Sequence, residues 1–428
     1  MKILLKNCNI IDTIYDYKNI NDIMIENERI SEISGSIYDK ADKTIDINGM
    51  VVAPGFIDMH CHLREPGFEY KETIKTGTQA AAKGGFTTVC CMPNTNPVID
   101  NIDDLKDLKE IIKNNSLIET IPIGAVTKNQ NGNELVDLKS MLNHGVKLFS
   151  DDGNPIWNDI IMEECLSLSN KENILIIDHC EDLDLVAGGV INEGAISRRL
   201  GLKGISNLSE TKPIIRNIML AEKTNSSIHI AHISAAESLE AIKEAKSKGI
   251  KVSCEVTPHH ISLCEDDIVE GNTDFKVNPP LRSKEDVIAL QHGLRDGIIN
   301  IIATDHAPHN EKDKKGDFYK AANGISGIEI AFSVCFTYLV RTGILTLKEL
   351  FKLMSLNPSN VLKLNKGRIF VGGIADLTVI DLYKKFKVSK DDFISKGKNT
   401  PFHSKSLWGE VIMTILSGKT VFKKEGVL

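Results

Sequence analysis

The chain has 428 residues, of which 42% are hydrophobic and 25% charged, and its formal net charge is −7. This length accommodates two or three ordinary domains or one large barrel with an appendage, and the composition is that of a globular protein. The acidic balance excludes the basic surface typical of nucleic-acid-binding proteins, and no apolar run has the length needed to span a bilayer.

The first residues, MKILLKNCNIIDTIYD, lack the long apolar stretch and the small-residue cleavage site of a secretory signal. The nine cysteines are scattered without CxxC spacing, which is typical of reduced thiols. We therefore expect a cytoplasmic protein that acts on a small molecule, with neither nucleic acid nor membrane as a partner.

The two ends of the chain have a similar pattern of short alternating strands. The N-terminal stretch contains MKILLKNCNII, NDIMIENERISEIS and KTIDINGMVV, and the C-terminal stretch contains ADLTVIDL and SLWGEVIMTILSGKTVFKK. Neither end is large enough for a core of its own. We therefore predict one small β-sandwich domain built from residues 1–52 together with residues 366–428.

Between these ends, short apolar runs alternate with stretches of helical periodicity such as AAESLEAIKEAKSKG. The runs are rich in β-branched residues, as parallel strands buried on both faces are. There are eight: 51–60, 85–92, 120–126, 145–150, 173–179, 226–232, 250–256 and 300–305. The pattern predicts a (β/α)8 barrel over residues 53–365. A doubly wound open sheet is the competing α/β architecture, but no GxGxxG follows the first run.

Residues able to bind a metal ion lie at the predicted carboxyl ends of these strands, where barrels build active sites. They are His60, His62, Asp151, Asp152, His179, His232 and Asp305. Each alone has a structural explanation, such as a hydrogen-bonded core histidine or a turn in SDDG. Together they predict a metal centre, because imidazoles and carboxylates suit zinc. Four imidazoles and two carboxylates are more ligands than one tetrahedral zinc ion takes, so two zinc ions that share a carboxylate are preferred over one. A hydroxide between the two ions would be the nucleophile for amide hydrolysis.

Longer motifs extend this pattern over nearly the whole chain: INGMVVAPGFIDMHCHLREPGFEYKETIKTGT, TVCCMPNTNPVID, HCED, EVTPHHI, VNPPLRS, ATDHAPH and GGIADLTVIDL. With these motifs the sequence resembles the type I dihydroorotases of the amidohydrolase superfamily. The resemblance implies a zinc-dependent enzyme that reversibly cyclises N-carbamoyl-L-aspartate to L-dihydroorotate in de novo pyrimidine (UMP) biosynthesis.

The resemblance also assigns roles to the candidate ligands. It implies one zinc ion held by His60, His62 and Asp305, and a second held by His179 and His232. By its spacing to His179, Asp152 is the implied bridging ligand, with the neighbouring Asp151 as the alternative. Asp305 would also shuttle the proton between the hydroxide and the ring nitrogen.

The implied substrate has a free carboxylate, which matches the bidentate geometry of a guanidinium. The implied substrate-binding residues are His62, Arg64, Asn94, Asn278, His309, Asn323 and Gly324. Asn94 and Asn278 also have a plainer explanation as turn or cap residues beside prolines.

The sequence departs from the family pattern at two places. Ala322, Asn323 and Gly324 replace the usual Pro-Phe-Gly, and Asp178 replaces a small residue before His179. The polar stretch 310–323, which contains these changes in part, follows the eighth run and is predicted to be a mobile lid or a long solvated loop.

Two alternatives remain open. Hydantoinases, dihydropyrimidinases and allantoinases use the same barrel but usually bridge their metals with a carboxylated lysine near the end of the fourth strand, whereas Lys147 lies inside that run and aspartates end it. A non-catalytic assembly partner of aspartate transcarbamoylase would have lost ligands that this chain retains. We expect a homodimer, and an association with aspartate transcarbamoylase stays open.

Overall fold

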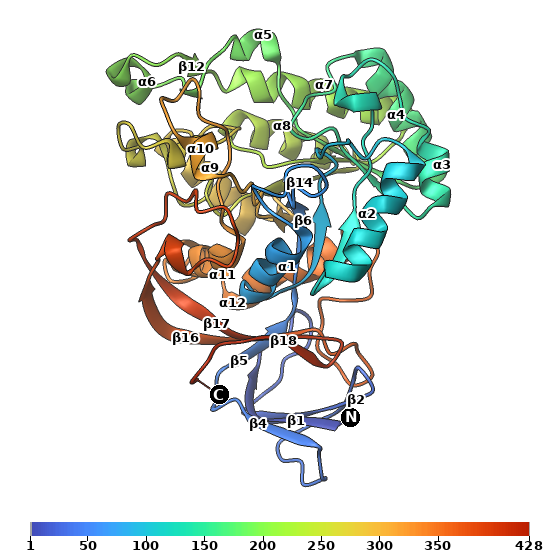
Figure 1. The fold of residues 1–428 in the computed structure, drawn as a ribbon, viewed down its shortest axis with the longest axis vertical. Helices are drawn as coiled ribbons and strands as arrows, with labels where there is room; N and C mark the ends of the chain where they lie inside the picture. Colours follow the sequence, from blue (N-terminus) through green and yellow to red (C-terminus); the bar gives the residue numbers. More distant parts are fainter. Residues whose placement is uncertain (1, 428) are drawn as a thin grey trace.

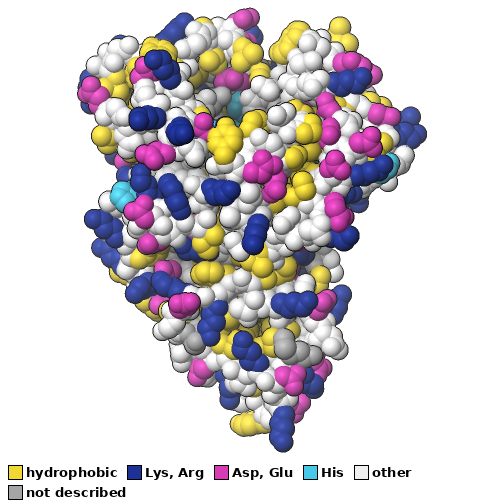
Figure 2. Space-filling model, viewed as in Figure 1, with side chains coloured by type: hydrophobic (Ala, Val, Ile, Leu, Met, Phe, Trp, Pro, Cys, Tyr) yellow, Lys and Arg dark blue, Asp and Glu magenta, His cyan; other side chains and the backbone are white. Residues whose placement is uncertain are grey.

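The computed structural model describes residues 2–427, with a sheet at one end of the molecule and a barrel at the other (Figure 1). Over these residues, no helix has the length and apolar character needed to cross a membrane. Basic and acidic side chains are interspersed over the face shown in Figure 2.

Both ends of the chain contribute to the terminal sheet, whose strand order is β18-β17-β16-β5-β1-β2-β3 with β4 paired to β1. The strands are β1 (Lys2–Ile10), β2 (Asn21–Glu26), β3 (Arg29–Ser34), β4 (Lys43–Asp46), β5 (Val51–Pro54), β16 (Leu377–Lys387), β17 (Ser406–Leu416) and β18 (Lys419–Lys423). Apolar side chains from both ends share one buried core, which includes Leu5, Ile23 and Met413. The two short ends therefore obtain together the core that neither could form alone.

Eight parallel strands form the barrel. They are β6 (Phe56–Cys61), β7 (Phe86–Cys91), β8 (Glu119–Pro122), β9 (Leu148–Phe149), β10 (Leu175–Asp178), β13 (Ile228–Ile230), β14 (Val252–Val256) and β15 (Ile301–Ile302). Their ladders make two sheets, β6-β7-β8 and β9-β10-β13-β14-β15, and single parallel bridges join these sheets between Gly124 and Phe149 and between Cys61 and His306. Every residue of β6 and β7 is buried, which explains why these runs are largely apolar.

Helices surround the barrel strands. The main ones are α1 (Ile74–Lys83), α2 (Ile102–Asn115), α3 (Leu138–Asn143), α4 (Asp159–Glu172), α7 (Leu208–Thr224), α8 (Ala236–Ser247), α9 (Lys284–Arg295), α11 (Ala331–Cys335), α12 (Leu347–Phe351) and α13 (Asn357–Val361). Side-chain caps set the starts of several of them, as where Asn101 accepts hydrogen bonds from the backbone at the start of α2. Short elements occupy the loops after the strands: α5 (Leu183–Val186), α6 (Ala195–Leu200), α10 (Glu311–Lys314), β11 (Ile191–Asn192) and β12 (Gly204–Ile205). In Figure 1, α5, α6 and β12 lie far from the terminal sheet.

The first apolar run contains two strands rather than one. Residues 51–54 form β5, which pairs with β1 and β16 of the terminal sheet, and β6 pairs with β7 of the barrel. Gly55 separates the two strands, and a Cβ atom there would lie 2.4 Å from the Thr87 side chain. A glycine is thus needed where the chain passes from one sheet to the other.

The division into a β-domain of residues 1–52 with 366–428 and a barrel of residues 53–365 stays a proposal. Residues 388–405, between β16 and β17, leave the terminal sheet and lie against the barrel. There the Asn399 side chain donates a hydrogen bond of 3.0 Å to the Ala307 carbonyl. The C-terminal stretch therefore contributes to both parts of the molecule.

Candidate active site

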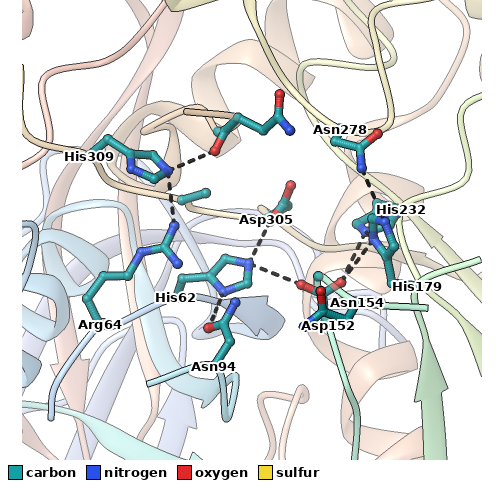
Figure 3. Close-up of a pocket in the computed structure, with 14 residues that line it drawn as sticks. His62, Arg64, Asn94, Asp152, Asn154, His179, His232, Asn278, Asp305 and His309 are labelled. Carbon is teal, nitrogen blue, oxygen red and sulfur yellow. Dashed lines mark hydrogen bonds and ion pairs between the residues drawn. The ribbon is translucent and has the colours of Figure 1, made fainter. Parts of the chain in front are cut away.

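A pocket of about 290 Å³ lies at the carboxyl ends of the barrel strands (Figure 3). The structure brings together in its lining all the candidate site residues except His60 and Asp151: His62, Arg64, Asn94, Asp152, His179, His232, Asn278, Asp305, His309, Asn323 and Gly324. Gly153, Asn154 and Ala307 complete the lining. His60 is fully buried beneath the pocket, and its ring centroid lies 5.3 Å from that of His62.

The positions of these residues follow from the strands. His60 lies on β6 and His62 just after it, His179 follows β10, and His232 and Asp305 lie shortly after β13 and β15. His232 and Asp305 have positive φ angles of 27° and 43°, which non-glycine residues adopt rarely. Such conformations cost about 1–3 kcal/mol each and persist mainly at functional sites, where the surroundings hold them.

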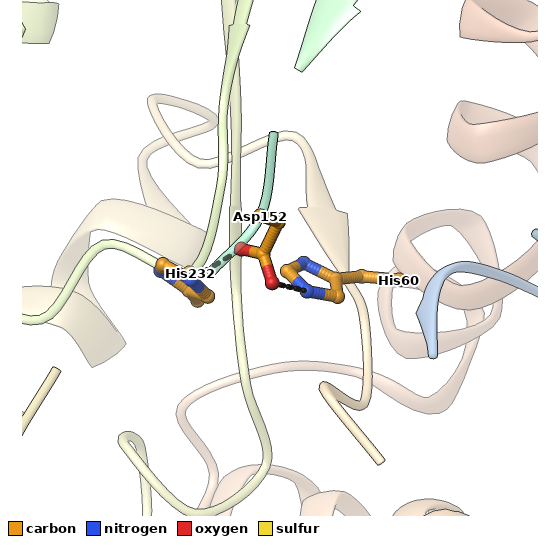
Figure 4. A group of neighbouring side chains, drawn as sticks. All are labelled: His60, Asp152 and His232. Carbon is orange, nitrogen blue, oxygen red and sulfur yellow. Dashed lines mark hydrogen bonds and ion pairs between the residues drawn. The ribbon is translucent and has the colours of Figure 1, made fainter. Parts of the chain in front are cut away.

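Asp152 lies between two pairs of histidines. One carboxylate oxygen, Oδ2, is 3.4 Å from Nε2 of His60 and 3.4 Å from Nε2 of His62. The other oxygen, Oδ1, is 3.4 Å from Nδ1 of His179 and 3.2 Å from Nε2 of His232 (Figure 4 shows Asp152 between His60 and His232). The two oxygens of a single carboxylate therefore face two separate histidine pairs.

Asp305 completes the first of these groups. Its Oδ1 is 3.0 Å from Nε2 of His62 and 3.5 Å from Nε2 of His60. The ligand atoms of His60, His62 and Asp305 lie within 4.8 Å of one another, as do those of His60, Asp152 and His232. Nε2 of His60 is buried and has no hydrogen-bond partner among the described residues 2–427. A metal ion satisfies such an atom, and the donors are those that zinc prefers.

Electrostatics keep these carboxylates ionised. Burial alone would raise the pKa of Asp152, but the charge of His60 and hydrogen bonds with His179 and His232 lower that pKa well below its usual value. The pKa of Asp305 is lowered in the same way, against burial, chiefly by the hydrogen bond with His62. Both groups are therefore available as anionic ligands.

Asp151, the alternative bridging residue, is engaged elsewhere. Its Oδ1 accepts hydrogen bonds from the backbone N–H groups of Val126 at 2.8 Å and Thr127 at 3.1 Å, and its Oδ2 accepts one from the Thr127 hydroxyl. Asp151 is not part of the pocket lining, whereas Asp152 is. Within the SDDG turn, the structure thus separates a residue that fixes the loop from one that faces the histidines.

Glu255 belongs to the site, although sequence reasoning did not single it out. It is fully buried on β14, and its Oε1 is 2.7 Å from Nδ1 of His60. Its Oε2 is 3.1 Å from Nε2 of His229, whose Nδ1 lies 2.8 Å from the Ser253 hydroxyl. This carboxylate accepts the Nδ1 proton of His60 and so leaves Nε2 free to bind metal. The sequence feature that could have indicated Glu255 is its charge inside the largely apolar run VSCEV.

The substrate-binding candidates lie on two sides of the pocket. In Figure 3, Arg64 and His309 are on one side, and His179, His232 and Asn278 are on the other. Nη2 of Arg64 is 3.4 Å from Nε2 of His309. Burial lowers the pKa of Arg64 to about 10 and, with the nearby Arg64 charge, lowers the pKa of His309 to about 2. A guanidinium cation beside a neutral imidazole makes this side suitable for an anion.

The two asparagine candidates have partners within the site. Oδ1 of Asn94 is 3.0 Å from Nδ1 of His62, so this amide orients the His62 ring. Nδ2 of Asn278 donates a hydrogen bond of 2.9 Å to Glu181, a second residue that sequence reasoning missed. Asp178, which departs from the family pattern, is buried and accepts a hydrogen bond of 2.6 Å from Asn217.

Lys147 directly precedes β9, is exposed and is not part of the pocket lining. A bridging carboxylated lysine would have to reach the histidines from within the pocket. Asp152 faces the histidines from the pocket lining, whereas Lys147 does not belong to it.

Comparison with known proteins reveals similarity over the whole chain. A family model described as "Dihydro-orotase-like" matches residues 49–238. A "Dihydroorotase" of Thermoanaerobacter sp. (strain X514) is 47% identical over 425 residues, which cover 99% of this chain and 98% of the relative. A "Dihydroorotase" of Ruminiclostridium cellulolyticum is 45% identical over 428 residues, covering 100% of both chains.

Solved structures have the same fold. An L-hydantoinase (dihydropyrimidinase) from Arthrobacter aurescens superposes with a TM-score of 0.89 at 25% identity, covering 100% of this chain and 97% of that chain. A D-hydantoinase superposes with a TM-score of 0.88 at 24% identity, covering 99% and 95%, and this likeness concerns the fold alone. The predicted α/β barrel with a terminal β-sandwich is thereby confirmed.

Proposed function

Because the chain belongs to the dihydroorotase family, we propose that its pocket carries out the reversible cyclisation of N-carbamoyl-L-aspartate to L-dihydroorotate as follows. Ring closure joins the ureido nitrogen to one carboxyl group with loss of water, and the second carboxylate does not react. The observation that carries the assignment to this pocket is the position of Arg64 and His309, across the pocket from His179 and His232. One side suits the unreactive carboxylate, and the other suits the reacting amide.

The site fits a metal cofactor, and we propose two zinc ions. His60, His62 and Asp305 would hold one ion, and His179 and His232 the other, with Asp152 as the shared ligand. The division of the two Asp152 oxygens between the two histidine pairs supports this arrangement. When bound, such ions activate water and polarise the amide carbonyl.

The protein side chains then orient the substrate. Arg64 pairs with the unreactive carboxylate, and this contact places the reacting amide beside Asp152 and Asp305. Asn94 keeps the His62 ring in position. Asn278, which lines the pocket and donates a hydrogen bond to Glu181, would contact the opposite edge of the substrate ring.

We assign the proton transfer to Asp305. Its lowered pKa keeps the carboxylate ionised, so it can accept a proton from water in the hydrolytic direction. It would return this proton to the ring nitrogen as the amide bond breaks, and the reverse transfer accompanies ring closure. Asp305→Asn is expected to retain bound metal but lose turnover.

We further propose a homodimer in the cytoplasm, with association to aspartate transcarbamoylase as a separate possibility to test. Exposed apolar side chains on the adjacent helices α4 and α7, Ile160, Ile215 and Met219, support a protein contact there. The nine free cysteines, eight of them buried, support a reducing compartment. Light scattering of the purified chain, alone and mixed with aspartate transcarbamoylase, tests both assemblies.

A matched pair of substrates tests the function. Dihydrouracil is dihydroorotate without the carboxylate, so the two rings differ only in the group assigned to Arg64. The purified protein supplied with zinc is expected to open the dihydroorotate ring, which is measured as a loss of ultraviolet absorbance, and to leave dihydrouracil intact. Turnover of dihydrouracil or hydantoin without turnover of dihydroorotate would refute the assignment, and metal analysis of the same samples gives the number of ions.

A further inference from the structure

Residues 321–324, which we call the wall segment, form one side of the pocket without belonging to a helix or strand. Asn323 and Gly324 line the pocket directly. Gly324 has a φ of +140°, and a Cβ atom there would lie 2.7 Å from the Ala307 carbonyl oxygen. The wall segment therefore packs closely against the loop that follows Asp305.

All four backbone carbonyls of the wall segment accept hydrogen bonds from side chains. The donors for Ala321, Asn323 and Gly324 include Nζ of Lys276 at 2.6 Å, Nε2 of His309 at 2.8 Å and Nδ2 of Asn399 at 2.9 Å, respectively. Nζ of Lys314 donates to Ala322 at 2.9 Å and to Gly324 at 3.2 Å. Side-chain donors thus hold the carbonyls of the segment, while backbone N–H groups of the segment donate to nearby carbonyls, as that of Gly324 does to Lys276 at 3.0 Å.

Lys314 is the centre of this arrangement. Its side chain is buried, with 6% of the residue exposed, and its ammonium also donates to the Lys276 carbonyl at 3.0 Å. An ammonium has three donors, and each has a carbonyl partner. Among residues 2–427, its hydrogen-bond partners are backbone carbonyls alone. Burying a charge is costly unless it is well satisfied, so this lysine serves the carbonyls around it.

We propose that Lys314 is a positioning residue that fixes the wall segment, together with the Asn399 amide, so that Asn323 and Gly324 face the substrate in one arrangement. The stretch 310–323 is then anchored by its own helix α10 rather than free to move as a lid over its whole length. Phe318 in the same stretch is also buried, with 4% exposed. The identity of the substrate in this proposal rests on the proposed function, whereas the hydrogen bonds that hold the wall segment are independent of it.

The test compares Lys314→Met, which removes the donors, with Lys312→Met, which alters an exposed lysine of the same helix. For Lys314→Met, kcat/KM for dihydroorotate is expected to fall by about tenfold to a hundredfold, mainly through KM, because a displaced wall misplaces the substrate. Bound metal should stay at the wild-type level. Lys314→Arg, which keeps the charge, is expected to recover part of the loss, and Lys312→Met should match the wild type.

Hydrogen exchange provides a readout that does not need turnover. In the zinc-loaded protein, Lys314→Met should accelerate exchange in the peptide covering residues 316–324 while barrel-strand peptides keep their protection. Asn399→Asp, which removes the amide donor but keeps an acceptor, should give the same local pattern. Faster exchange throughout the barrel, or unchanged exchange with KM within twofold of wild type, would overturn the positioning role. If the wild type itself does not open dihydroorotate, the proposed function fails while the exchange result still decides this proposal.

Discussion

The contact between Glu255 and His60 allows a quantitative prediction about metal affinity. The substitution Glu255→Gln keeps the size and one acceptor oxygen but removes the charge. In the structure both partners are fully buried, and the distance from Oε1 to Nδ1 of His60 is 2.7 Å. Burial alone would raise the pKa of Glu255, but His60 and His229 lower it to about 2. The wild-type carboxyl group is therefore ionised at every working pH.

The magnitude follows from the loss of this charge. A hydrogen bond to a charged group contributes about 1.5–3 kcal/mol, against about 0.5–1.5 kcal/mol for a neutral pair. The substitution should therefore weaken the His60 contact by about 1–1.5 kcal/mol, which corresponds to a loss of about tenfold in metal affinity. Replacing a partner that orients a metal-binding histidine typically costs about 10–100-fold, in agreement with this figure.

The assay is a titration of metal-free protein with zinc in a metal buffer, followed by turnover of dihydroorotate. Glu255→Gln should need about tenfold more free zinc for half-maximal activity and should approach wild-type turnover at saturating metal. Glu329→Gln is the matched control, since Glu329 is a buried carboxylate that accepts hydrogen bonds from the backbone of Ile394 and Ser395. If Glu255→Gln and the control show the same zinc dependence as the wild type, His60 is not oriented by this carboxylate.

Three further predictions concern other parts of the pocket. Arg64→Lys removes the bidentate guanidinium and should raise KM for dihydroorotate about tenfold with a smaller change in kcat, as steady-state kinetics would reveal. Asp152→Asn should lower the bound metal measured by mass spectrometry, whereas Asp151→Asn should lower thermal stability and leave the metal content near wild type; the reverse result would make Asp151 the ligand. Burial and Arg64 lower the pKa of His309 to about 2, so below the unfolded-state pKa of about 6.5 the unfolded chain binds the extra proton and the folded state loses stability as pH falls. His309→Gln removes this effect. The free energy of unfolding of the metal-free variant, measured in urea, should therefore rise by about 2 kcal/mol relative to that of the wild type between pH 7.5 and pH 5. A difference that does not change with pH would contradict the lowered pKa.

The eight barrel strands could be predicted because most of them are buried on both faces and leave largely apolar runs in the sequence. The first run is instructive because residues 51–60 are apolar for two different reasons. Val51–Pro54 is buried in the terminal sheet and Phe56–Cys61 in the barrel, and burial alone does not distinguish two cores. The partners of a strand depend on long-range pairing, such as that of β5 with β16, which local pattern does not contain.

The candidate metal ligands could also be predicted, since each lies at the end of a recognisable strand or shortly after it, and strand ends converge in a barrel. The residues that hold them in place were harder to find. Lys314 is one of four lysines between positions 312 and 320, and nothing in its local sequence indicates that it alone is buried. Asn399 lies about 90 residues beyond His309, whose backbone N–H donates to its side chain, so only the folded structure brings the two together.

The pairing of β5 with β16 also determines the order in which this protein can be assembled during synthesis. Pro54 pairs with Leu377, so the strand that leads directly into His60 and His62 has no partner on this side until the ribosome has made most of the chain. By then every candidate metal ligand, the last being Asp305, has already emerged. Closing so long a loop is slow relative to local contacts, and the nascent chain can therefore present a complete set of metal-binding side chains before the sheet that anchors its first barrel strand is complete.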